Sequence, residues 1–192
     1  MPRPPAAREA VLDAFERLII ADGERTATLD ATARAAGVSK GGLLYHFGSK
    51  QALVAGLVER LLRLVDDDLV RIDEAPDGAI AYFLRSSLDI QTPLDHTFVA
   101  ILRLAQGGDR EAGRALDEAE TRWLAALTGH VGDPTLALAV TLMGDGLYHR
   151  AALRAEAVDG DLADSTAAAV GVGVSSEQLT ALVALLERLA AR

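Results

Sequence analysis

The chain has 192 residues, of which 50% are hydrophobic and 24% are charged, as is usual for a globular protein with enough apolar material for a core. It contains no cysteine, which excludes disulfides, thiolate metal sites and cysteine nucleophiles. No apolar stretch is long enough to span a bilayer and no signal-peptide pattern opens the chain, so we expect a cytoplasmic protein without a membrane partner.

The formal net charge of −9 is unevenly distributed along the chain. Residues 1–60 hold 8 basic and 7 acidic residues, whereas residues 61–192 hold 11 basic and 21 acidic ones. The acidic body of the protein, residues 61–192, repels nucleic acid, so a DNA partner would be steered toward the head, residues 1–60. Because the protein is acidic overall, it fails the general test for a basic nucleic-acid-binding domain. The inference that it binds DNA therefore depends on a local motif.

Hydrophobic periodicity is helical along the chain and predicts an all-α fold of about nine helices. An apolar stripe through Phe15 marks a first helix that ends near Gly23. Thr28 is a candidate N-cap for a second helix and Ser39 for a third. Gly37 lies between them and suits the positive φ that ends a helix. These two short helices joined by a tight turn predict a helix-turn-helix, whose second helix enters the DNA major groove.

Cap and proline signals mark the starts of the later helices. We expect starts at Ser49 (for a helix running to about Ile72), Pro76, Thr92-Pro93, Asp109 (for a helix running to about His130) and Asp133-Pro134. Residues 158–175 combine three glycines with no helical stripe and are predicted to form a long mobile loop.

A capping box from Ser175 to Gln178 opens the last helix, which carries a broad apolar face. So wide a face needs partners on two sides. It indicates either pairing with a second subunit or burial in the core of a monomer.

The only two lysines in the chain, Lys40 and Lys50, fall in the stretch from Ala31 to Val58 that lacks Asp and Glu. The other 17 basic residues are arginines. Arginine-biased codon usage with two lysines here by chance is one explanation. The other is that both lysines contact DNA, because each falls where a phosphate contact is expected.

The run GVSKGGLLYHFGSKQAL, at residues 37–53, resembles the DNA-binding signature of the TetR (tetracycline-repressor-like) family of transcriptional regulators. The resemblance covers about residues 8–60. It implies a three-helix DNA-binding domain over residues 1–50 and a helical effector-binding and dimerisation domain over residues 51–192. It further implies a homodimer formed through the last two helices, which favours the paired reading of the last helix.

Carried over by position, the resemblance implies DNA contacts from Thr28, Ser39, Lys40, Gly41, Leu44, Tyr45, His46 and Lys50. Lys40 is the best candidate for a base contact, because lysine reaches the O6 and N7 acceptors of guanine. Gly42 and Leu44 depart from the commoner pattern, in which polar or aromatic side chains contact DNA. Specificity therefore depends on Lys40, the N-terminal arm and DNA shape.

The body is expected to hold an effector pocket. The candidate residues are Tyr82, Phe83, Asp89, Phe98, Trp123, Met143, Asp145, Tyr148 and His149. For each residue taken alone, packing in the core or a place on the surface is a more ordinary role than contact with a ligand. Asp145 lies in an apolar stretch, and a carboxylate buried there needs an arginine or a cationic ligand as its partner. No residue set predicts a metal or a cofactor.

These features predict a dimeric, ligand-responsive regulator, most simply a repressor released from a pseudo-palindromic operator by a small molecule. The alternatives are a DNA-binding regulator without an effector, and a helical interaction module with a vestigial head. An enzyme is disfavoured, because no G-x-S-x-G, H-E-x-x-H or P-loop motif occurs and the four histidines are scattered. The sequence does not identify the effector, the operator or the regulated genes.

Overall fold

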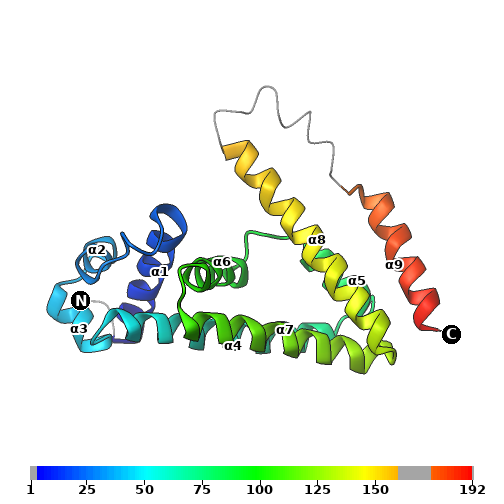
Figure 1. Cartoon of the computed structure of the whole chain (residues 1–192), viewed down its shortest axis with the longest axis horizontal. Coiled ribbons are helices and arrows are strands. Elements are labelled where there is room, and N and C mark those ends of the chain that lie inside the picture. The colour runs from blue at the N-terminus through cyan, green and yellow to red at the C-terminus, as the bar shows by residue number, and fades with distance from the viewer. Residues whose placement is uncertain (1–3, 160–173, 192) are drawn as a thin grey trace. The chain divides into compact units, whose positions relative to one another are not determined.

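The computed structural model describes residues 4–159 and 174–191, and in these ranges the chain forms nine helices and no strand (Figure 1). The predicted all-α fold is confirmed. The helices are α1 Pro4–Asp22, α2 Leu29–Ala35, α3 Lys40–His46, α4 Lys50–Asp73, α5 Ala79–Ser86, α6 Pro93–Gln106, α7 Arg110–Val131, α8 Pro134–Asp159 and α9 Ser176–Ala190.

The chain divides into two compact units that are not continuous in sequence. Unit 1 consists of residues 1–66 and 93–119, and unit 2 of residues 67–92 and 120–192. In unit 1, α1 packs against α2, α3 and α6; in unit 2, α5, α8 and α9 pack together. Helices α4 and α7 each contribute to both units. These two units are defined by packing. The division at residue 50 into a DNA-binding domain and an effector-binding domain is a division by function, and it stays a prediction.

The helices that begin after Ser49, Asp109, Asp133 and Ser175 follow their predicted caps, because each of these side chains accepts from a backbone N–H group within three residues. Asp109 Oδ1 accepts from the backbone N–H groups of Glu111 and Ala112, and Asp133 Oδ1 accepts from those of Thr135 and Leu136. Ser49 Oγ accepts from the Ala52 amide at the start of α4. The capping box of Ser175 and Gln178 is present in both directions.

The prediction that Pro76 opens the fifth helix is wrong by three residues. The Gly78 amide donates to the Ala75 carbonyl oxygen, which makes Pro76 the second residue of a turn. That position suits the φ of proline as well as a first helical turn does. Helix α5 then begins at Ala79, after Gly78 with a φ of +89°.

Unit 2 has one apolar core formed by α5 with the parts of α4, α7, α8 and α9 that belong to this unit. Its fully or nearly buried members include Ile72, Leu84, Leu127, Val140 and Leu186. The predicted mobile loop at 158–175 falls almost entirely outside the described residues; α8 itself extends through Asp159. Among the described helices, none is long and apolar enough to cross a membrane.

Candidate nucleic-acid interface and effector region

The turn between α2 and α3 has the geometry of a helix-turn-helix. Thr28 Oγ1 accepts from the Ala31 amide to cap α2, and Ser39 Oγ accepts from the Gly42 amide to cap α3. Gly37 has a φ of +68°, a conformation that costs other residues free energy. The local sequence therefore positions both helices through hydrogen bonds spanning only a few residues.

Buried contacts hold α3 in place within unit 1. Leu43 and Phe47 are buried, and Ala33 is buried on α2. Gly56 on α4 lets Phe47 and Leu12 approach closely, because an added Cβ would lie 2.9 Å from a Phe47 ring carbon and 3.0 Å from Leu12 Cδ2. The recognition helix is thus locked from its inner side by apolar packing.

The outer side of α3 is exposed. Tyr45 is 83% exposed, and Lys40, Gly41 and Leu44 are also exposed. His46 is partly buried, and its ring meets that of Tyr45 edge-on with centroids 5.1 Å apart. The exposed side of α3 is therefore available for contact with a partner.

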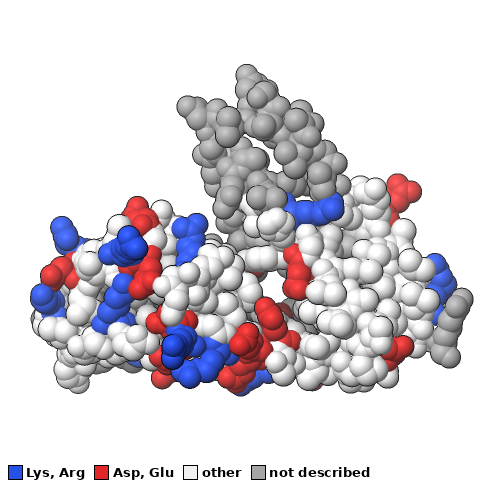
Figure 2. All heavy atoms as spheres, in the orientation of Figure 1, with Lys and Arg blue, Asp and Glu red and all other residues white. Residues whose placement is uncertain are grey.

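Both lysines form ion pairs in unit 1, which the sequence analysis missed. Lys40 Nζ lies 3.0 Å from Asp30 Oδ1, and Lys50 Nζ lies 3.2 Å from Glu24 Oε1. Lys50 also donates to the Glu24 carbonyl oxygen at 2.7 Å. The carboxylates come from just before the acid-free stretch. The position of Asp30 at the edge of that stretch could have indicated its ion pair with Lys40. Nothing in the sequence indicated that Glu24 pairs with Lys50. Figure 2 shows Lys and Arg interspersed with Asp and Glu at the end of the molecule that carries α3.

A second charged network ties α1 to its neighbours in unit 1. Arg60 of α4 reaches Glu9 at 2.7 Å, Asp13 at 2.8 Å and Glu16 at 3.5 Å, which lie on one face of α1. The carboxylates of this network, with Glu9 and Asp13 foremost, raise the pKa of Arg60 despite its burial. Buried Glu16 also accepts from Thr97 Oγ1 of α6 at 2.6 Å. Helix α1, which supports α2 and α3, is therefore bonded to both α4 and α6.

In unit 2, two of the effector candidates meet at a residue that was not predicted. Asp68 is only 6% exposed, and its two carboxylate oxygens accept from Tyr82 Oη at 2.7 Å and from Trp123 Nε1 at 3.0 Å. Burial, with the Asp68 carboxylate, raises the pKa of Tyr82 to about 12. Asp68 ends an acidic run that looks solvated, but it lies three residues after buried Val65 and four before buried Ile72. That spacing was the available signal.

The remaining effector candidates are scattered. Phe83 is buried against Gly144, where an added Cβ would lie 2.4 Å from its ring. That glycine therefore packs α8 against α5. Tyr148 is partly buried in unit 2, and Phe98 is partly buried in unit 1.

The exposed candidates are Asp89, Met143, Asp145 and His149. Asp145 was expected to be buried; the residue is exposed along α8, although partial burial of its carboxyl group raises the carboxyl pKa. Neighbouring residues of α8 and α9 present large apolar side chains to solvent: Leu138, Leu142, Leu185 and Leu189.

Comparison with known proteins agrees with this geometry. The model of a family described as "Bacterial regulatory proteins, tetR family" matches residues 11–57. Salmonella enterica GusR superposes with a TM-score of 0.65 at 19% identity, covering 100% of this chain and 99% of that chain. A gamma-butyrolactone receptor (ArpA-like protein) superposes with a TM-score of 0.59 at 20% identity, covering 98% of this chain and 99% of that one.

The fatty acid degradation regulator FadR from Bacillus halodurans superposes with a TM-score of 0.57 at 18% identity, covering 96% of this chain and 94% of that chain. No curated protein matches the sequence. At these identities the structural neighbours establish the fold, while the match over residues 11–57 concerns the helix-turn-helix itself. Residues 11–57 therefore match the helix-turn-helix DNA-binding region of the tetR family of bacterial regulatory proteins, and the chain as a whole shares the fold of these solved structures.

Proposed function

We propose that the protein is a homodimeric repressor that binds a pseudo-palindromic operator and is released from it by a small-molecule effector. The observation that carries the proposal is the two-sided character of α3, where Leu43 is fully buried while Tyr45 and Lys40 are exposed. A helix fastened on one side and free on the other can dock in a major groove without rearranging its own domain.

The contacts proposed to DNA fall into two groups. Thr28, Ser39, Tyr45, His46 and Lys50 bind phosphates and position the head. Lys40, Gly41 and Leu44 face base edges, where lysine contacts guanine and leucine contacts a thymine methyl group. Thr28 and Ser39 each cap a helix N-terminus, where backbone N–H groups favour an anion.

Dimerisation through α8 and α9 is supported by their exposed leucines. A monomer gains nothing by leaving Leu142 61% exposed beside the exposed Leu138, whereas a second copy of the chain would bury both. Two heads on a two-fold axis would read half-sites about 34–36 Å apart, one turn of DNA. This is the inverted-repeat architecture that the proposal requires.

The effector is proposed to bind in the body near Tyr82, Asp68 and Trp123. A buried carboxylate that accepts from two neutral donors provides polar groups inside an otherwise apolar core, which suits recognition of a small molecule. One structural neighbour is named as a gamma-butyrolactone receptor, so this fold accommodates small-molecule recognition. Helix α4, which carries Asp68 and also Lys50, is proposed to transmit binding to the head.

Selection of duplexes from a random pool by the purified protein tests this function. An inverted repeat should be enriched at moderate salt and should then serve as the probe in an effector screen. A regulator without an effector would enrich the repeat but show no release by any small molecule. If no motif is enriched, and no duplex is bound even at low salt where phosphate contacts are strongest, the interaction-module alternative replaces the proposal.

A further inference from the structure

The ammonium group of Lys50 is largely occupied within the protein. It lies 2.7 Å from the carbonyl oxygen and 3.2 Å from Oε1 of a single residue, Glu24, in the loop between α1 and α2. An ammonium group has three N–H donors, so one remains for a phosphate. Both side chains are about one-third exposed, at 35% and 34%, whereas the Lys40–Asp30 pair is about 60% exposed. The Lys50 pair is therefore less screened by water.

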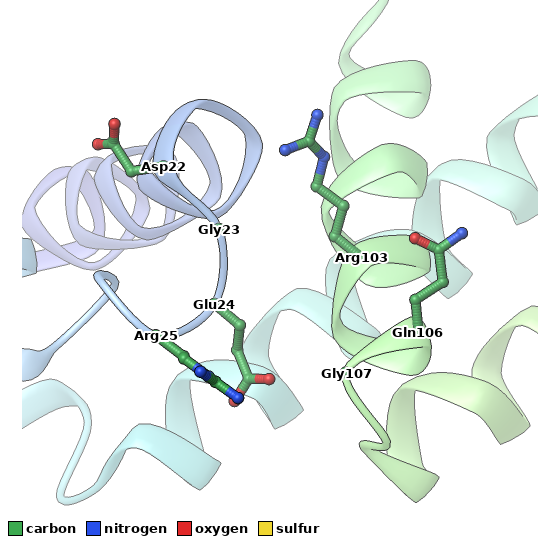
Figure 3. A pocket seen from close by; sticks show the side chains of 7 residues that line it. All are labelled: Asp22, Gly23, Glu24, Arg25, Arg103, Gln106 and Gly107. Carbon is green, nitrogen blue, oxygen red and sulfur yellow. The ribbon is translucent and has the colours of Figure 1, made fainter.

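The residue that follows α6, Gly107, lies next to the Glu24 side chain. A Cβ atom added at Gly107, just after the end of α6, would lie 2.5 Å from Glu24 Oε2. The two residues also line a cleft of about 510 Å³ together with Arg25 and Arg103. Figure 3 shows the loop after α1 facing the C-terminal turn of α6 across this cleft. Only a residue without a side chain leaves room for the carboxylate at that place.

Within unit 1, Glu24 therefore lies close both to Gly107 and to Lys50. A carboxylate paired with Lys50 neutralises the charge that a DNA phosphate would bind, and the phosphate must compete with it. The backbone carbonyl bond does not have this effect, because it holds the ammonium without cancelling its charge.

We propose that Glu24 is an autoinhibitory residue that competes with a DNA phosphate for Lys50, and that Gly107, just after the end of α6, leaves the room that its carboxylate needs in the competing position. This inference rests on the proposed function, because it assigns Lys50 a phosphate contact. Glu24 thereby lowers the affinity of the head for every DNA sequence.

Glu24→Gln tests the competition directly, because it removes the charge while keeping the side-chain size and the carbonyl contact. Affinity for the selected operator and for an unrelated duplex should both rise about threefold to fivefold, the scale of a partly exposed ion pair. The logarithmic salt slope should steepen by up to about one unit, as one more counterion is released. Fluorescence anisotropy across a salt series measures both quantities.

Two matched variants separate the proposal from general effects. Glu59→Gln removes one negative charge from the same unit, but Glu59 pairs with Arg8 instead of a predicted DNA-contacting lysine, so a smaller gain is expected. Gly107→Ala should displace the Glu24 carboxylate and tighten binding, whereas Gly113→Ala should not, because an added Cβ there meets no atom within 4 Å.

The double variant Glu24→Gln/Gly107→Ala should bind no more tightly than Glu24→Gln alone, since both changes remove one contact. If wild-type protein binds no duplex, the proposed function and this inference both fall. If wild-type protein binds but Glu24→Gln binds equally or more weakly, the autoinhibitory role alone is overturned and Glu24 instead positions Lys50. An equal gain from Glu59→Gln overturns it as well, because overall charge then explains the effect.

Discussion

Lys40 and Lys50 occupy different settings in the head and should therefore affect DNA binding differently. Lys40 begins the recognition helix and makes an exposed pair with Asp30, which competes weakly with DNA. Lys50 begins α4 and is held by Glu24. We therefore expect Lys40 to contact bases and Lys50 to contact the DNA backbone, the two kinds of contact that DNA recognition combines.

Lys40→Ala should relax the preference for one base position, while Lys50→Ala should weaken binding to all sequences and lower the salt slope by up to about one unit. The comparison needs the selected operator, a single-base variant of it and an unrelated duplex, each titrated at several salt concentrations. Unchanged binding in both variants would remove these lysines from the interface.

Tyr82 provides a pH test of the body. Burial, reinforced by Asp68, raises its pKa to about 12 from an ordinary value of 10. A raised pKa in the folded state means that the unfolded state loses its proton first. The contribution to stability is complete below pH 10 and is lost as pH rises toward about 12.

The absorbance of wild-type protein minus that of Tyr82→Phe should show the Tyr82 phenolate appearing near pH 12. In the Asp68→Asn variant the phenolate should appear at a pH part of the way back toward 10. Between these two pH values wild-type protein should lose stability faster than Tyr82→Phe in denaturant titrations. A phenolate that appears at pH 10 in the folded protein would contradict the buried Asp68–Tyr82 contact.

The packing of the DNA-binding head depends on the close approach of Leu12 and Phe47 to the backbone of α4 at Gly56. Gly56 of α4 permits Phe47 and Leu12 to pack against the helix backbone, where a methyl group would overlap them. In an exposed helix interior the same change from glycine to alanine is favourable, by roughly 0.5–1 kcal/mol, because alanine loses less backbone entropy. Sterics and propensity therefore oppose each other at this position.

Gly56→Ala should destabilise the protein by about 1–3 kcal/mol, the usual cost of overpacking, and should weaken DNA binding by displacing Phe47. Gly113→Ala is the matched control and should be neutral or stabilising, since its Cβ meets no atom within 4 Å. Urea titrations of the two variants measure the difference. A stabilised Gly56→Ala would show that the head can repack without cost.

At the scale of the whole molecule, the proposed function assigns the exposed leucines of α8 and α9 to the interface of a dimer. Leu142→Arg should therefore yield a monomer by light scattering, with unchanged helical circular dichroism. Operator affinity should drop sharply, because each head then binds one half-site alone. Val70→Arg is the control, since Val70 is 53% exposed on α4, outside both helices. A dimeric Leu142→Arg would remove this surface from the interface.

The sequence alone was sufficient for features that depend on near neighbours in the chain. Thr28, Ser39, Asp109 and Asp133 each accept from an amide two or three residues further on, so their helix starts can be read from local composition. Pro76 is the exception, because a turn and a first helical turn accept proline equally well. The helix-turn-helix was readable for the same reason, since its caps, its turn glycine and its buried Leu43 fall within 20 residues.

Only the tertiary structure decided which distant residues meet. Glu24 pairs with Lys50 across 26 positions, and Trp123 bonds Asp68 across 55. A charged residue in an acidic run reads as solvated until packing places it beside two aromatic donors. The energy of such contacts depends on burial and on geometry between elements, and neither is encoded by spacing along one helix. For that reason the caps and the turn glycine of the helix-turn-helix were predictable from the sequence, whereas the groups that restrain Lys50 and surround Asp68 were not.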